Sequence, residues 1–169
     1  MRKKTLLFLL IANGVLLTLG WVMAFYSYPR LPQEMPLWIN FFKQQVILMK
    51  RTPLFFLYPL VQTLFCLGFW WLSRIDLSME FMPAREEYSF SEKKILFSNL
   101  RKEYIYLTLI FFNLIFIHLQ RTLILMAHKI EKGVSEFYFF SIFGIILILI
   151  PWYRLRVNLL VQKVGKFKE

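Results

Sequence analysis

Four stretches of this chain are apolar over enough consecutive residues to cross a membrane. They cover residues 5–26, 53–73, 104–126 and 137–153, with more polar segments between them. At about 1.5 Å of rise per residue, roughly 20 apolar residues span a hydrocarbon core about 30 Å thick. The pattern predicts an all-α fold, an integral membrane four-helix bundle that forms a single membrane domain over residues 1–169.

The first stretch follows the basic start Arg2-Lys3-Lys4, so a cleaved signal peptide is an alternative to a first membrane helix. The apolar part is too long for a signal peptide, and no small-x-small cleavage site precedes Tyr28. We therefore expect an uncleaved helix with aromatic side chains at its far end.

The largest polar segment, residues 74–103, separates the second and third stretches. Ser89-Phe90-Ser91-Glu92 matches a capping box, in which Ser89 and Glu92 each satisfy a backbone N–H at a helix start. Apolar side chains then recur at helical spacing up to Tyr104. This pattern predicts an amphipathic helix that lies on the membrane or leads directly into the third span.

The distribution of Lys and Arg predicts the orientation. Fourteen of these residues lie in the N-terminus, the 74–103 segment and the C-terminal tail, against six in the 28–52 loop and the last turn. Because basic residues favour the cytoplasmic side, both termini are expected there, with the 28–52 loop facing outward. The predicted location is the cell (inner or cytoplasmic) membrane, crossed several times.

Composition agrees with a membrane protein and narrows the partners. The chain is 58% hydrophobic and 19% aromatic, and its mean hydropathy is +0.53, outside the usual range of soluble domains. The net charge of +11 comes from residues that flank the apolar stretches. Anionic lipid headgroups explain this placement, and no Arg-Gly or aromatic-platform motif indicates nucleic acid. The expected partners are the lipid bilayer and another membrane protein or a second copy.

The 28–52 loop contains three prolines within eight positions, from Pro29 to Pro36. Each proline fixes φ, lacks an N–H and disfavours helix at the residue before it, so we expect a rigid, extended, non-helical ribbon. Such a ribbon belongs at a membrane surface or against protein, because lipid would leave its backbone groups unpaired. The candidate partner-binding residues here are Leu31, Pro32, Glu34, Pro36, Trp38 and Asn40.

Residues 31–40 resemble a bacterial membrane family of unknown function that also forms the amino-terminal module of SdpI-type immunity proteins. In that family a loop reading Leu-Pro-x-x-[Ile/Val]-Pro-x-His-x-Asn follows the first span, and the resemblance covers about residues 1–73. The matching residues are Leu31, Pro32, Met35, Pro36 and Asn40, together with Lys50 and Pro53. Trp38 stands in place of the family's His, and residues 41–45 replace a Gly-containing stretch. The resemblance therefore implies the architecture and an immunity-like role more than any chemistry of that His.

The third stretch carries four polar side chains: Asn113, His118, Gln120 and Arg121. At about 100° per residue, Gln120 falls about 20° from Asn113, Arg121 about 80° and His118 about 140°, so one polar arc facing the bundle interior is expected. The arc could join helices, with Arg121 reaching the interface along its own stem, or it could line an ion path or ligand pocket. No carboxylate lies within the stretch to serve a proton relay.

Other chemistry finds no support in the sequence. His118 and His128 have no acidic or cysteine residues at metal-ligand spacing, and no catalytic triad, Walker loop or dinucleotide motif is present. We therefore expect neither an enzyme nor a cofactor or metal. The first hypothesis is a non-catalytic accessory subunit or immunity- or sensor-like regulator that binds a membrane partner or peptide. The alternatives are a minor transporter or channel subunit that uses the polar arc, and a lipid- or quinone-binding enzyme.

Overall fold

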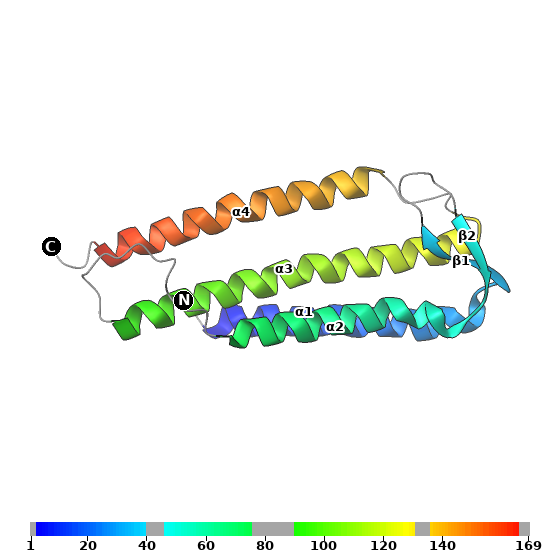
Figure 1. Ribbon diagram of the computed structural model, residues 1–169, viewed down its shortest axis with the longest axis horizontal. Helices are drawn as coiled ribbons and strands as arrows, with labels where there is room; N and C mark the ends of the chain where they lie inside the picture. Colours follow the sequence, from blue (N-terminus) through cyan, green and yellow to red (C-terminus); the bar gives the residue numbers. More distant parts are fainter. Residues whose placement is uncertain (1–2, 40–45, 76–89, 131–135, 166–169) are drawn as a thin grey trace.

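The computed structural model describes residues 3–39, 46–75, 90–130 and 136–165. Within them, four long helices run side by side, and a two-stranded hairpin lies across one end of the molecule (Figure 1). We call that end the hairpin end. The elements in chain order are α1 (Lys3–Ser27), η1 (Tyr28–Arg30), β1 (Glu34–Ile39), β2 (Val46–Lys50), η2 (Pro53–Phe56), α2 (Leu57–Arg74), α3 (Phe90–Ala127) and α4 (Glu136–Gly165).

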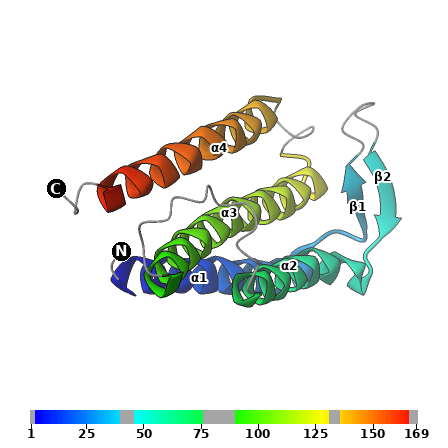
Figure 2. The ribbon, with the colours of Figure 1, turned by 60° about the vertical axis from the view of Figure 1, so that its left-hand side comes forward.

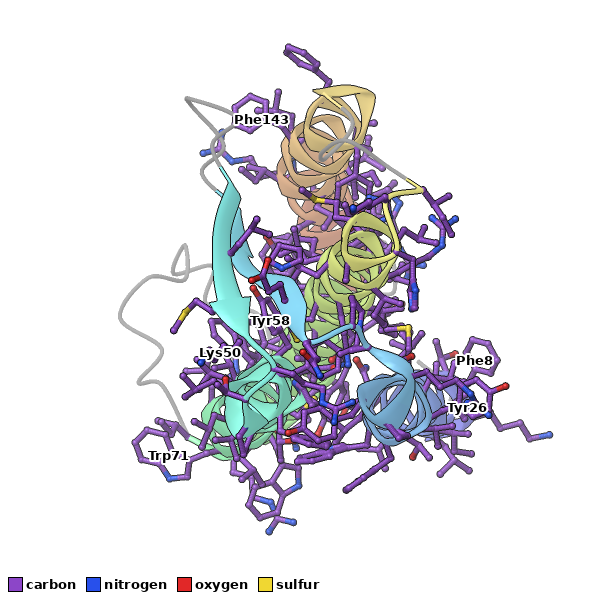
Figure 3. All side chains as sticks on the ribbon, turned by 90° about the vertical axis from the view of Figure 1, so that its right-hand side faces the viewer. Phe8, Tyr26, Lys50, Tyr58, Trp71 and Phe143 are labelled. Carbon is purple, nitrogen blue, oxygen red and sulfur yellow. The ribbon has the colours of Figure 1, made fainter. Side chains whose placement is uncertain are left out.

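Three helical segments are long and apolar enough to cross a membrane. They are Lys4–Arg30, Pro53–Arg74 and Ser98–Ala127, with 27, 22 and 30 residues. Large side chains point outward from them, including Phe8, Tyr26 and Trp71, which are 69%, 65% and 65% exposed (Figure 3). Such exposure suits a lipid surround, which is itself apolar. The mostly helical fold is therefore confirmed, with three helices long and apolar enough to cross a membrane, whereas insertion into a membrane and a crossing by α4 stay predictions.

The helix bounds decide one expectation that the sequence left open and correct another. Helix α3 is continuous over Phe90–Ala127, so the segment before the third span leads directly into it; Ser89 of the expected capping box lies outside the described residues. Helix α4 does not end at the Pro151–Arg154 anchor but continues through Pro151 to Gly165. A proline removes one helical hydrogen bond, and the turns on either side keep theirs, so the helix can persist.

Helices α1, α2 and α3 pack closely, and α4 lies along the opposite side of α3 (Figures 1 and 2). The contacts between α3 and α4 include two ring pairs, Tyr104 with Tyr153 at 4.6 Å and His118 with Tyr138 at 3.5 Å between centroids. Near the end opposite the hairpin, Arg156 of α4 lies 3.8 Å from the buried carboxylate of Glu103. These contacts join α4 to α3.

The 28–52 loop is a β-hairpin in its described part rather than an unpaired ribbon. Strands β1 and β2 pair antiparallel from Glu34–Lys50 to Ile39–Val46, with a bulge between Pro36 and Trp38. The expected extended backbone is thus present, but it is paired, and Tyr28–Arg30 departs from it by forming a 3-10 turn. Pro29 suits that turn because its φ is already helical and its missing N–H has no helical partner there.

A compact apolar core fixes the hairpin to the helices. It joins α1, the chain before β1, β1 itself, η2 and the end of α3 through the buried residues Ala24, Leu31, Met35, Phe55 and Ala127. Aromatic rings surround it, with Tyr28 and Phe56 at 5.0 Å between centroids. Burying apolar side chains contributes about 25 cal/mol per Å² of area removed from water. The hairpin is therefore a fixed part of the bundle.

Candidate functional site

Three amide side chains meet inside the α1–α2–α3 bundle. Asn113 Nδ2 donates to Asn13 Oδ1 at 2.8 Å, and Gln62 Nε2 donates to Asn113 Oδ1 at 3.0 Å. Asn13 Nδ2 in turn donates to the backbone oxygens of Leu9 and Tyr106, at 2.8 and 3.0 Å. All three side chains are buried, at 6%, 0% and 1% exposure for Asn13, Gln62 and Asn113. We call them the amide cluster.

The amide cluster takes one residue from each of three helices, so it can form only when all three pack together. Gly20 of α1 makes room for it, because a Cβ at this position would overlap Gln62 Oε1. The thiol of Cys66 adds a weak donor to Asn113 Oδ1 at 3.5 Å. In an apolar surround, amides that satisfy one another fix which helix faces meet.

Gln120 lies about two turns beyond Asn113 on nearly the same face of α3. It is 1% exposed, yet its Oε1 and Nε2 have no hydrogen-bond partner in the described structure. Gln62 Oε1, in the amide cluster, is also buried without a partner. A buried unpaired amide costs about 1–3 kcal/mol, so Gln120 is the least satisfied of the candidate residues in α3.

The other two polar residues of α3 lie elsewhere. His118 faces α4, where its ring stacks on Tyr138, and Arg121 is exposed. The expectation that all four residues form one arc facing the interior is therefore wrong for Arg121. Burying an unpaired guanidinium would be far more costly than leaving it at the surface, and a position about 80° from Asn113 is far enough around the helix to escape the α1–α2 contact.

The hairpin candidates divide into buried and exposed residues. Leu31 and Pro36 are buried, Pro32 is partly buried and Glu34 is exposed. Trp38 belongs to β1, but its side chain and all of Asn40 lie outside the described residues. Leu31 and Pro36 therefore shape the hairpin from within and cannot contact a partner directly.

Arg51 holds the base of the hairpin, a role that the sequence analysis missed. Its backbone N–H donates to the Gln33 oxygen at 2.7 Å, and its guanidinium donates to the oxygens of Pro29 and Leu31, both at 3.3 Å. The same guanidinium lies 5.8 Å from the centroid of the Tyr28 ring. Arg51 thus satisfies loop carbonyls that would otherwise need water.

The exposed charges at the hairpin end are mostly positive. The described cations there are Arg30, Lys50, Arg51, Arg121 and Lys129, and Glu34 is the acidic residue that accompanies them in the described hairpin. Exposed apolar side chains lie among them, since Leu48 is 63% and Met49 39% exposed. The hairpin end therefore presents a basic surface with apolar side chains on β2.

These features define the class as a mostly helical protein with three helices long and apolar enough to cross a membrane and a hairpin fixed across one end. Among the described residues no three His, Cys, Asp or Glu side chains come together as metal ligands. No family model matches the chain, and no curated protein or solved structure shows significant similarity to it. The resemblance of residues 31–40 to SdpI-type immunity proteins therefore stays a prediction.

Proposed function

We propose that the chain is a small non-catalytic multi-pass protein of the cell (inner or cytoplasmic) membrane, an accessory subunit or an immunity- or sensor-like regulator. Its hairpin end binds another membrane protein or a peptide. The observation that carries this proposal is the hairpin itself: its inner side chains Leu31 and Met35 are buried at 4% and 1%, while Leu48 on β2 is 63% exposed.

A surface that is already fixed loses little conformational entropy on binding, which favours affinity. The amide cluster supports the same function by holding α1, α2 and α3 in one arrangement beneath the hairpin. In the proposed orientation the two chain termini are cytoplasmic and the hairpin faces outward, because most Lys and Arg flank the helix ends opposite the hairpin.

The test is purification from the native membrane in mild detergent, with quantitative mass spectrometry of the proteins that remain bound. A matched pair of variants, Leu48→Glu on β2 and Leu159→Glu on α4, places the same charge at two exposed apolar positions, 63% and 47% exposed. We expect a stoichiometric partner that Leu159→Glu retains and Leu48→Glu loses. The proposal would be refuted if no stoichiometric partner is found, or if the partner binds the Leu48→Glu variant as well as it binds the wild type.

The second candidate is a minor transporter or channel subunit, and Gln120 is the observation that favours it. A buried amide without a partner is a feature expected where a polar solute passes or binds. The test is solute or ion flux in proteoliposomes for the wild type and Gln120→Leu, which has a similar volume and no polar atoms. Flux that falls in the variant would support this candidate, and absence of flux in both would exclude it.

A further inference from the structure

The pairing of β1 with β2 determines which backbone groups of β2 point outward. Arg51 N–H donates to the Gln33 oxygen, so Gln33 and Arg51 form a hydrogen-bonded pair. Hydrogen-bonded and non-hydrogen-bonded pairs alternate along an antiparallel ladder. Glu34–Lys50 and Pro36–Leu48 are consequently non-hydrogen-bonded pairs, and the N–H and C=O groups of Leu48 and Lys50 point away from β1.

Pro36 agrees with this assignment. A proline has no N–H and occurs within a sheet where no ladder bond is required of it. Directly opposite Leu48, at a non-hydrogen-bonded position, Pro36 costs the hairpin no hydrogen bond.

The two edges of the hairpin have different surroundings. Strand β1 lies against α3, and β2 forms the outer strand (Figure 2). Figure 3 looks onto the hairpin end and shows β2, which ends at Lys50, farther from α3 than β1. In the described part of the chain, the sheet has two strands and no backbone hydrogen bond reaches the outward groups of Leu48 or Lys50. An edge strand of this kind is a template for a further strand.

The side chains of this edge indicate which strand it would accept. Leu48 and Lys50 are two residues apart, so they project from the same face of the sheet, and both are exposed. A second copy of the chain would bring another basic hairpin end, with its own Arg30, Lys50 and Arg51, to this edge, whereas an acidic strand would face these cations with opposite charge. Charge complementarity favours an acidic strand.

We propose that the free edge of β2 binds an extended acidic peptide segment, which adds a third strand to the hairpin and places an apolar side chain beside Leu48 and a carboxylate beside Lys50. This inference rests on the proposed function and specifies how its hairpin end recognises a partner. The backbone groups supply the pairing, and an apolar and an acidic side chain two residues apart, on the face of Leu48 and Lys50, supply the selectivity.

The test uses the full chain in lipid nanodiscs and a phage library of random peptides, with empty nanodiscs as the counter-selection. The selected peptides should carry an apolar residue and an acidic residue two positions apart, so that both side chains lie on the face of Leu48 and Lys50. The best of them is then synthesised in two forms. One form is N-methylated at the odd-numbered amides and the other at the even-numbered amides, so that each form blocks the N–H groups along one edge of the peptide strand. Because only one edge pairs with β2, one form should lose at least about tenfold in affinity, as two lost hydrogen bonds of about 1 kcal/mol each imply, and the other should lose little.

A variant of the protein tests the same edge from the other side. Leu48→Pro removes the outward N–H while leaving the ladder with β1 intact, as Pro36 does across the sheet, and Leu48→Val is its control because it keeps the N–H and an apolar side chain. Leu48→Pro should lose the peptide and Leu48→Val should retain it. Lys50→Glu should reverse the preference from acidic to basic peptides.

Equal affinity of the two N-methylated forms would overturn the inference. A selected pool without an apolar and an acidic residue two positions apart, or the absence of any selected pool, would overturn it as well. So would a disulfide between two copies through Leu48→Cys in a Cys66→Ser background, since the edge would then hold a second copy. The methylation result does not depend on the folding of any variant. A native partner that is lost with Leu48→Glu but retained with Leu48→Pro would refute strand addition and leave the proposed function standing. Selected peptides of the expected pattern without any native partner would support strand addition and refute the proposed function.

Discussion

The hydrogen bond between Asn13 of α1 and Asn113 of α3 can be tested by a double-mutant cycle. The changes are Asn13→Ala, Asn113→Ala and the two together. Asn113→Ala removes the donor to Asn13 Oδ1 at 2.8 Å and the acceptor of Gln62 Nε2 at 3.0 Å, so Asn13 Oδ1 loses its partner in the amide cluster. We expect each single change to lower the free energy of unfolding.

The magnitude follows from the number of contacts and their surroundings. A hydrogen bond between membrane helices contributes about 0.6 kcal/mol on average and up to about 1.7 kcal/mol, and a stranded buried polar atom costs about 1–3 kcal/mol. Asn113→Ala should therefore cost about 2–3 kcal/mol. The coupling energy of the cycle should lie between about 0.6 and 1.7 kcal/mol, because the loss of packing around each residue cancels in the difference.

Unfolding of the purified protein in mixed detergent micelles, followed by the loss of helical circular dichroism, measures these free energies. Asn158→Ala, the same substitution at an exposed position of α4, is the matched control and should change stability little. Additivity of the two single changes within about 0.3 kcal/mol would show that the Asn13–Asn113 bond does not form, and the packing of α1 on α3 would then be wrong.

Three further outcomes follow from individual contacts. Gly20→Ala should lower the free energy of unfolding in the same assay, because the added Cβ would overlap Gln62 Oε1. Gly68→Ala is its control and should be neutral or slightly stabilising, because nothing lies within 4 Å of a Cβ there. Equal effects of the two changes would contradict the placement of Gln62. Gln120→Leu should leave the unfolding free energy unchanged or raise it, since it removes an unpaired buried amide, and a loss above about 1 kcal/mol would reveal a bound partner. Arg156→Ala should lower the free energy of unfolding by about 1 kcal/mol or more, because Arg156 is 40% exposed but the Glu103 side chain, at 8%, would stay buried without its cation. No measurable loss would mean that the Glu103 carboxylate is reached by water.

The helices could be predicted from the sequence because length and apolar content suffice for them. Apolar stretches such as 5–26 and 53–73 correspond to α1 and to η2 with α2. The end of α4 could not be found in the same way. Pro151 with the aromatic and basic residues after it is typical of a helix end at an interface, but whether a helix continues through a proline depends on what satisfies the freed carbonyl.

The amide cluster shows why only part of the site was predictable. Asn113 was found because it stands among other polar residues, whereas Asn13 and Gln62 each stand alone in an apolar stretch. Helical angles compare residues within one helix and carry no information about which other helix lies opposite. The available signal was weaker: each of three membrane-length stretches carries an amide side chain, which is a reason to expect that these amides meet, because lipid offers them no other partner.

The hairpin was missed because the prolines were considered one at a time. Each proline disfavours an α-helix, and none of Pro29, Pro32 and Pro36 lies in one, but a strand excludes a proline only at positions where its N–H would complete the ladder. Pro36 occupies a position opposite Leu48 where no such bond is made, so its presence is compatible with a paired strand. Whether a proline is tolerated therefore depends on the phase of the pairing, and that phase is set outside the proline segment, by the Arg51 N–H and the Gln33 oxygen. The same phase leaves the backbone groups of Lys50 directed outward, so the feature that permits Pro36 within β1 also gives β2 its free edge.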